Sequence, residues 1–177
     1  MSTQSNASGY MQAMQSDDES LPVAALIDQY VNGVSLLSQA LAGITDDQAR
    51  LRPIPGKWSC LELVAHLAGA EIFFTDRIER VIALDKPLLV GVDERDYPAR
   101  IGYQDLVLAD ESALFIALRA HMKTVLRRQP PDAWQRVAIH TETGMVTLRQ
   151  LLLQPIRHLN HHLVFMLEKR KALGLSN

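Results

Sequence analysis

Two histidines near the carboxyl end of the chain, His158 and His162, have the spacing of a helical metal site. Residues four apart on an α-helix project from one face, about one turn apart, so both imidazoles could reach a single ion. An HxxxH pair is also common by chance, and surface histidines usually carry no function. The spacing alone therefore leaves metal binding and an ordinary helix surface both open.

A third histidine, His66, lies in an apolar stretch that includes Leu61 and Val64. A buried neutral histidine bonded to a neighbour is the ordinary explanation for such a position. Metal sites in helical bundles, however, are built from side chains on facing helices, and small neighbours such as Ala65 and Ala68 would let another helix approach closely. Three nitrogen ligands would leave a coordination position for water or substrate, which is the catalytic arrangement.

Three further polar residues could support such a site. Glu62 and Gln154 each precede one of these histidines by one helical turn, so either could orient an imidazole through its second nitrogen. A helix cap already accounts for Glu62. His161 adjoins His162 but is rotated by about 100° around a helix, so it would contact substrate or pack beside the site.

Composition excludes several other classes of function. The 177-residue chain has 18 Lys and Arg against 20 Asp and Glu, so no basic field favours nucleic acid, and Lys169 to Lys171 suit the negative end of a helix. A single cysteine, Cys60, favours a reducing compartment, and neither a signal peptide nor a membrane span is visible. The chain lacks phosphate loops, a GxSxG elbow and the ExxH pairs of di-iron bundles. We therefore expect a cytoplasmic protein that binds neither nucleic acid nor a membrane.

Four amphipathic segments must position the candidate side chains. Their periodicity predicts helices over residues 21–41, 60–84, 110–128 and 148–173. Capping boxes mark two of the starts, because Ser59 is followed three residues later by Glu62, and Thr147 by Gln150. Four long helices with no convincing sheet predict an all-α fold, a four-helix bundle.

The segments between these helices are less regular. Residues 1–20 are rich in Ser, Gln and acidic side chains, so we expect a disordered tail before a single domain over residues 21–177. Residues 45–57 form a polar connection, and residues 85–109, which prolines and glycines interrupt, form a long crossover loop with at most a short helix. A weak hairpin signal covers residues 136–146.

Two stretches of the sequence carry a family pattern. The first is PGKWSCLELVAHLAGAEIFFTDR over residues 55–77, and the second is LRQLLLQPIRHLNHHLVFM over residues 148–166. Together they resemble the DinB/YfiT-like superfamily of metal-dependent enzymes, and the resemblance spans nearly the whole domain after the tail. Such a resemblance implies a four-helix bundle with a long crossover between its second and third helices.

The resemblance also implies a site and an activity. Its metal ligands would be His66, His158 and His162, holding a divalent ion, zinc or nickel, with water completing the shell. The protein would form a homodimer and act on a small-molecule substrate, with the ion activating a water or a low-molecular-weight thiol, as a hydrolase or a thiol S-transferase.

Two questions stay open at this level. The commonest family ending places Arg-Gly-Gln after the second histidine of the pair, whereas Leu163, Val164 and Phe165 follow here, as in the YfiT-like branch. That difference leaves the substrate and the thiol undetermined. The alternative to an enzyme is a non-catalytic, dimeric helical module that binds a small molecule and keeps its histidines as a vestigial or structural site.

Overall fold

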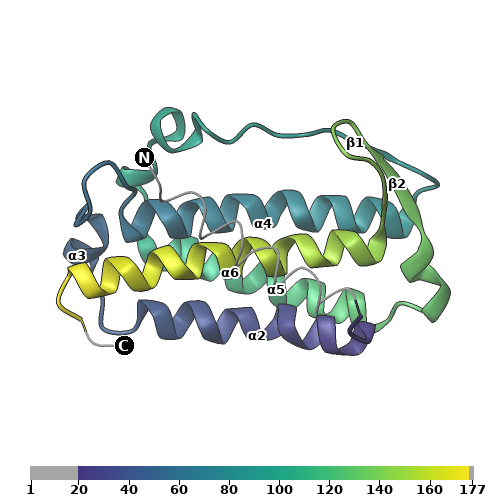
Figure 1. The fold of residues 1–177 in the computed structure, drawn as a ribbon, viewed down its shortest axis with the longest axis horizontal. Helices are drawn as coiled ribbons and strands as arrows, with labels where there is room; N and C mark the ends of the chain where they lie inside the picture. Colours follow the sequence, from purple (N-terminus) through teal and green to yellow (C-terminus); the bar gives the residue numbers. More distant parts are fainter. Residues whose placement is uncertain (1–19, 176–177) are drawn as a thin grey trace.

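The computed structural model describes residues 20–175, in which four long helices pack as a bundle (Figure 1). These helices are α2 (Val23–Leu41), α4 (Cys60–Ala83), α5 (Leu108–Arg127) and α6 (Leu148–Ala172). The predicted all-α four-helix bundle is confirmed, and each helix begins and ends within two residues of its predicted bounds. The tail predicted over residues 1–20 lies outside the described residues, except for Ser20.

Both predicted capping boxes form and fix where α4 and α6 begin. The Ser59 hydroxyl accepts a hydrogen bond from the Glu62 backbone N–H, and the Glu62 carboxylate accepts one from the Ser59 N–H. Thr147 and Gln150 pair in the same way at α6. Each box satisfies two backbone N–H groups that a helix start leaves without partners.

A third capping box opens a helix that the sequence analysis missed. The short helix α3 (Asp46–Arg50) lies in the segment predicted to be a polar connection. Thr45 and Gln48 form its capping box. Five residues are too few to display a helical period, so only the Thr-x-x-Gln spacing could have revealed this helix.

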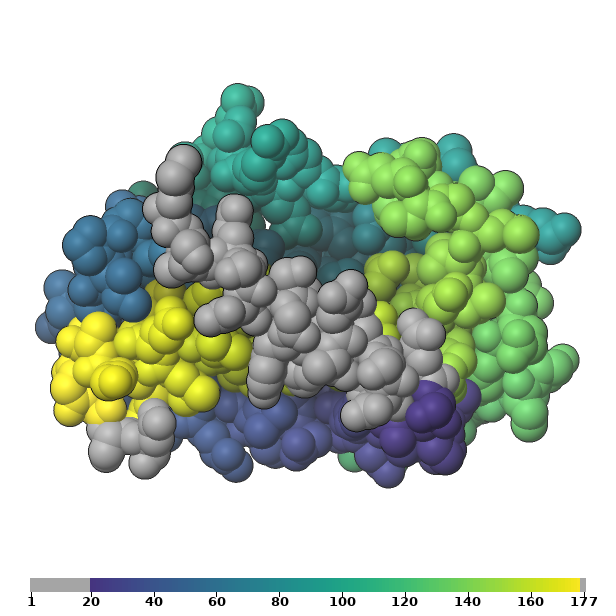
Figure 2. Space-filling view, in the orientation of Figure 1, coloured from purple at the N-terminus to yellow at the C-terminus, as the bar shows by residue number. Residues whose placement is uncertain are grey.

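The order of the helices requires a long crossover. α2 and α4 run antiparallel, but α5 runs in the same direction as α4, so residues 84–107 return along the bundle (Figure 1). This crossover contains strand β1 (Leu88–Leu89), a π-helical turn η1 (Pro98–Gly102) and a 3-10 turn η2 (Tyr103–Asp105). In the space-filling view it forms a raised edge beside the hairpin (Figure 2).

A small sheet adds to the helices. Strands β2 (Val137–His140) and β3 (Gly144–Thr147) pair antiparallel, which is the predicted hairpin. Strand β1 pairs parallel with β2, Leu88 opposite Ile139, and completes a three-stranded sheet that the sequence analysis did not predict. A strand of two residues is too short to show the alternation that identifies a strand.

The bundle interior contains two hydrophobic clusters. One includes Leu26 and Met122 and reaches the hairpin, and the other includes Leu37 and Phe115 and reaches α3. α4 contacts both α5 and α6, and α2 does the same, so the four helices enclose these clusters. Within residues 20–175, no helix combines the length and the hydrophobicity that a membrane crossing requires.

A buried polar layer joins all four long helices. Arg119 of α5, which is 1% exposed, donates through Nε and Nη2 to Glu71 Oε2 of α4 at 3.2 and 3.1 Å. Its Nη1 donates to the Tyr30 carbonyl of α2 at 2.7 Å, and Nη2 to the Pro155 carbonyl of α6 at 3.0 Å. The Tyr30 hydroxyl donates to the other Glu71 oxygen. One guanidinium therefore fixes how the four helices sit against one another.

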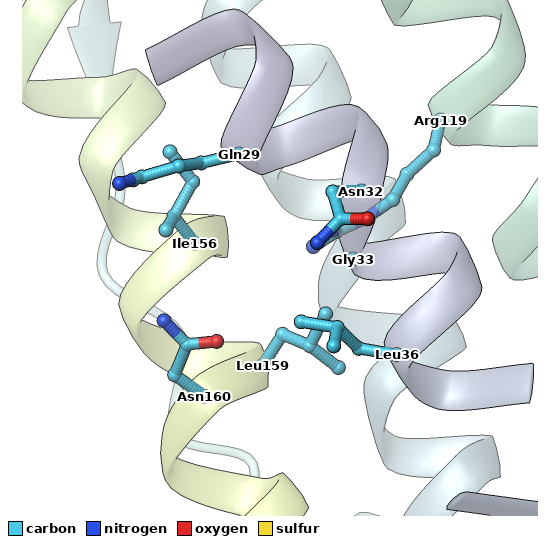
Figure 3. A pocket seen from close by; sticks show the side chains of 8 residues that line it. All are labelled: Gln29, Asn32, Gly33, Leu36, Arg119, Ile156, Leu159 and Asn160. Carbon is cyan, nitrogen blue, oxygen red and sulfur yellow. The ribbon is translucent and has the colours of Figure 1, made fainter. Parts of the chain in front are cut away.

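Gly33 makes room for this guanidinium. Figure 3 shows Arg119 reaching toward Gly33 in a cleft of about 160 Å³ between α2 and α6. A β-carbon on Gly33 would lie 2.0 Å from Arg119 Nη1 and 2.5 Å from Leu159 Cδ2, closer than atoms can approach. The absence of a side chain at this position thus lets α2 and α6 pack around a buried charge.

Candidate metal centre

Two facing helices bring three histidines to one point. His66 projects from α4, and His158 and His162 project from α6. The Nε2 atom of His66 lies 2.9 Å from Nε2 of His158 and 3.1 Å from Nε2 of His162. Within residues 20–175, this is the one group of at least three His, Cys, Asp or Glu side chains close enough to hold a metal ion.

The arrangement of the three nitrogens fits a metal ion better than it fits hydrogen bonding. A neutral imidazole carries one donor nitrogen and one acceptor nitrogen, so three Nε2 atoms aimed at one point cannot all bond to one another. Nitrogen ligands at about 2.0–2.1 Å from one ion lie about 3 Å apart. The separations of 2.9 and 3.1 Å match that spacing.

Burial keeps the two histidines of α6 neutral. It lowers the pKa of His158 to about 3, with the neighbouring His66 and His161 rings lowering it further. Burial also lowers the pKa of His162 to about 2, and the His158 and His66 rings add to the effect. The neutral imidazole is the form whose nitrogen lone pair binds a metal ion.

These pKa values predict how acid affects the metal-free protein. Both folded-state pKa values lie below 6.5, the ordinary value for histidine. Between those values and pH ~6.5 the unfolded chain therefore binds more protons than the folded chain does. These groups therefore leave the free energy of unfolding unchanged above pH ~6.5 and lower it as the pH falls below that value. Urea unfolding at pH 7.5, 6.5 and 5.5 measures the loss. The double variant His158→Gln/His162→Gln should lose less over the same range, and an equal loss in both proteins would contradict the prediction.

A carboxylate of the crossover lies against the outer nitrogen of His66. Glu94 Oε2 is 3.0 Å from His66 Nδ1, an ion-pair distance without the alignment of a hydrogen bond. Because Nε2 faces the other two histidines, Glu94 lies on the side away from the proposed ion. A carboxylate in this position fixes the tautomer and the orientation of a ligating imidazole. The sequence analysis missed Glu94, which belongs to a segment without periodicity.

Among the described residues, no hydrogen bond joins Glu62 to His66, although their spacing suggested one. Its Oε2 atom accepts hydrogen bonds from Arg52 Nε at 3.0 Å, from the Ser59 N–H at 2.7 Å and from Gln104 Nε2 at 3.1 Å. Three donors occupy the carboxylate, so it caps α4 and ties the crossover to the bundle.

The other two suggested supporting residues differ in their positions. Within the described part of the chain, no hydrogen bond joins Gln154 to His158. The His161 ring packs edge-on against His162 and Phe165, with ring centroids 5.0 and 4.8 Å apart. It therefore lies beside the three-histidine group, which is one of the two places the sequence analysis allowed.

Comparisons with known proteins agree with the fold and identify the family. The family model of the DinB superfamily matches residues 29–166, a range that contains all three histidines. A "putative metal-dependent hydrolase" of Oceanobacillus iheyensis is 23% identical over 152 residues, covering 82% of this chain and 88% of that protein. YfiT of Bacillus subtilis, described in the same words, is 26% identical over 144 residues, covering 79% of each chain.

Solved structures share the architecture. The structure of YfiT from Bacillus subtilis, described as "a probable metal-dependent hydrolase with an unusual four-helix bundle topology", matches with a TM-score of 0.80 at 22% identity, over 89% of this chain and 93% of that one. A mycothiol-dependent maleylpyruvate isomerase matches with a TM-score of 0.68 at 18% identity, over 83% of this chain and 61% of that one. At these identities the likeness establishes the fold alone.

Proposed function

Because this chain belongs to the DinB superfamily, we propose that it is an enzyme that depends on a divalent metal ion held by His66, His158 and His162. The observation that supports this most is the convergence of three Nε2 atoms from two facing helices, at 2.9 and 3.1 Å. Imidazole ligands suit zinc and nickel, which are the ions we expect.

The proposed chemistry is the activation of a nucleophile. A divalent ion with three nitrogen ligands lowers the pKa of a water or a thiol in its remaining position, which supplies a nucleophile near neutral pH. The surrounding side chains hold the ligand rings in place. The Trp58 ring lies 5.1 Å from the His66 ring and the Phe74 ring 5.5 Å from the His158 ring, so both limit access of bulk water.

Two reactions fit such a site, and the relatives support one each. Hydrolysis of a small molecule is supported by the names of the proteins from Oceanobacillus iheyensis and Bacillus subtilis. Transfer of a low-molecular-weight thiol to an electrophile is supported by the fold shared with a mycothiol-dependent isomerase. We propose that the protein carries out one of these two reactions.

Assays of metal-loaded protein test this proposal. The protein is purified without a histidine tag, because such a tag binds the same ions, and is assayed with a panel of small esters and amides and with low-molecular-weight thiols plus 1-chloro-2,4-dinitrobenzene. We expect turnover in one panel that a chelator abolishes and zinc or nickel restores. Bound metal without turnover in either panel would favour the non-catalytic, dimeric small-molecule-binding module instead.

Replacing Glu94 by glutamine should weaken metal binding. The amide keeps the size of the side chain but loses the charge beside His66 Nδ1, and the loss of such a partner costs about 10–100-fold in metal affinity. Competition with a chromogenic chelator measures the change. Glu79→Gln is the matched control, because Glu79 pairs with His121 at an exposed position, 2.7 Å apart. Equal affinities for Glu94→Gln and the control would contradict this role of Glu94.

A further inference from the structure

A second feature of the molecule adjoins the histidine group without being part of it. A cleft of about 260 Å³ lies between the loop that precedes α4 and the carboxyl-terminal half of α6. Its lining includes Lys57, Trp58, Leu63, His162, Phe165 and Lys169. Because His162 lines this cleft as well as belonging to the histidine group, a molecule in the cleft would lie next to the proposed ion.

The cleft contains two cations and no carboxylate to pair with them. Lys169 is 3% exposed, and the hydrogen bond of its ammonium is a long one, 3.5 Å to the Phe165 carbonyl. Among the described residues, no Asp or Glu oxygen lies within ion-pair distance of Lys169 or Lys57. A buried charge without a partner is costly, and proteins normally compensate it with an opposite charge.

The neighbours of Lys169 within the protein supply that charge only in part. Burial lowers the pKa of Lys169, and the nearby Cys60, Glu168 and Glu62 do not fully offset this effect. Burial raises the pKa of the Cys60 thiol, so that group is neutral near pH 7. Lys169 therefore has no carboxylate in direct contact among the described residues, and an anion in the cleft would supply one.

The other walls of the cleft are apolar. The Trp58 indole, the Leu63 side chain and the Phe165 ring line it, and the Lys169 ammonium lies 6.0 Å from the centre of the Phe165 ring. Such walls favour an apolar body over a bare inorganic anion, because they bury hydrocarbon and, of these three side chains, only the Trp58 indole N–H can hydrogen-bond to an oxygen atom. Charge at one end and apolar walls along the sides together define an amphipathic ligand.

We propose that this cleft binds the substrate of the metal centre, and that this substrate is a small organic anion. Its anionic group pairs with Lys169 and Lys57, and its apolar body lies against Trp58 and Phe165. The inference that the bound anion is a substrate rests on the proposed function. The binding of an organic anion in the cleft does not itself require the metal.

Binding of 4-phenylbutanoate to the metal-free and the zinc-loaded full-length protein, measured by isothermal titration calorimetry, tests the proposal. Its neutral analogue 4-phenylbutanamide has the same apolar body. We expect the carboxylate to bind at least about tenfold more tightly than the amide, since only the carboxylate can form charge-assisted hydrogen bonds with the two lysines. Equal affinities for the two compounds would overturn the proposal.

Variants locate the anion. Lys169→Met keeps the apolar stem and loses the charge, so it should bind 4-phenylbutanoate about tenfold more weakly. Lys57→Met tests the exposed lysine of the cleft and should weaken binding less. Lys171→Met removes an exposed lysine of the same helix and should leave binding unchanged. Undiminished binding in both Lys169→Met and Lys57→Met would overturn the proposal.

Metal content measured on the same samples separates this proposal from the proposed function. Selective anion binding by protein that takes up no zinc on loading would support the cleft and contradict the metal centre. Stoichiometric metal with no preference for the anion would do the reverse.

Discussion

Replacing His158 by alanine should lower the affinity for zinc or nickel at least about a hundredfold. Loss of a residue that only hydrogen-bonds to a metal ligand already costs about 10–100-fold in affinity, and this variant removes a ligand itself. His66→Ala and His162→Ala should have effects of the same size, since each also removes one of the three Nε2 atoms. The His66 Nε2 atom lies 2.9 Å from that of His158 and 3.1 Å from that of His162. Chelator competition on protein without a tag gives the affinities, and circular dichroism checks that the variants fold.

The neighbouring imidazole provides the control. His161→Ala changes the residue next to His162 on the same helix, but its ring packs against Phe165 beside the site, so metal affinity should change little. Metal affinities that are the same in His158→Ala, His161→Ala and the unchanged protein would rule out these histidines as ligands.

Replacing Arg119 by methionine should destabilise the fold by about 3–5 kcal/mol, because it leaves the Glu71 carboxylate buried without its counter-charge. A domain of this kind is stable by about 5–15 kcal/mol, so the variant should unfold at a much lower urea concentration. Burial raises the pKa of Glu71 even with Arg119 present. The variant should therefore recover part of its stability as the pH falls and Glu71 takes up a proton.

A double variant shows whether stability is lost because the ion pair is gone or because the Glu71 charge stays buried without a partner. Arg119→Met/Glu71→Leu removes both charges and should be more stable than Arg119→Met alone, since a buried ion pair replaced by apolar side chains is often neutral in stability. A matched control is Arg80→Met, because Arg80 pairs with Asp76 at the surface, where such pairs contribute about 0–1 kcal/mol. If Arg119→Met cost no more than this control, the polar layer would not hold the helices together.

Sequence patterns predicted the parts of this fold that depend on local interactions. The capping boxes at Ser59 and Thr147 fixed two helix starts, because the hydroxyl and the side chain three residues later satisfy each other without any tertiary partner. The buried pair of Arg119 and Glu71 could not be predicted in this way. An arginine in an amphipathic helix ordinarily lies at the surface, and Glu71, 48 positions away, makes its burial tolerable together with the Tyr30 and Pro155 carbonyls.

The candidate site likewise combines residues that local patterns predict with one that they do not. The spacing of His158 and His162 is local and readable, and the apolar surroundings of His66 pointed to a helix face that meets them. Glu94 reaches His66 only because the crossover folds back over α4, and no local pattern records that.

The basic run at the end of α6 shows the limit of a charge pattern. The sequence analysis treated Lys169 to Lys171 as charges at a helix end, yet Lys169 and Arg170 are buried, at 3% and 7% exposure. Arg170 Nη1 donates to the Ala40 carbonyl at 3.0 Å and to the Ala42 carbonyl at 2.6 Å. Only Lys171 is exposed, which makes it a suitable control for Lys169.

Anomalous scattering from a crystal of tag-free protein, loaded with zinc or nickel and measured on both sides of the metal absorption edge, tests the metal centre most directly. The proposed function predicts one strong peak per chain, about 2.0–2.1 Å from Nε2 of His66, His158 and His162. A peak at another position, or well-ordered histidines with no peak between them, would contradict it.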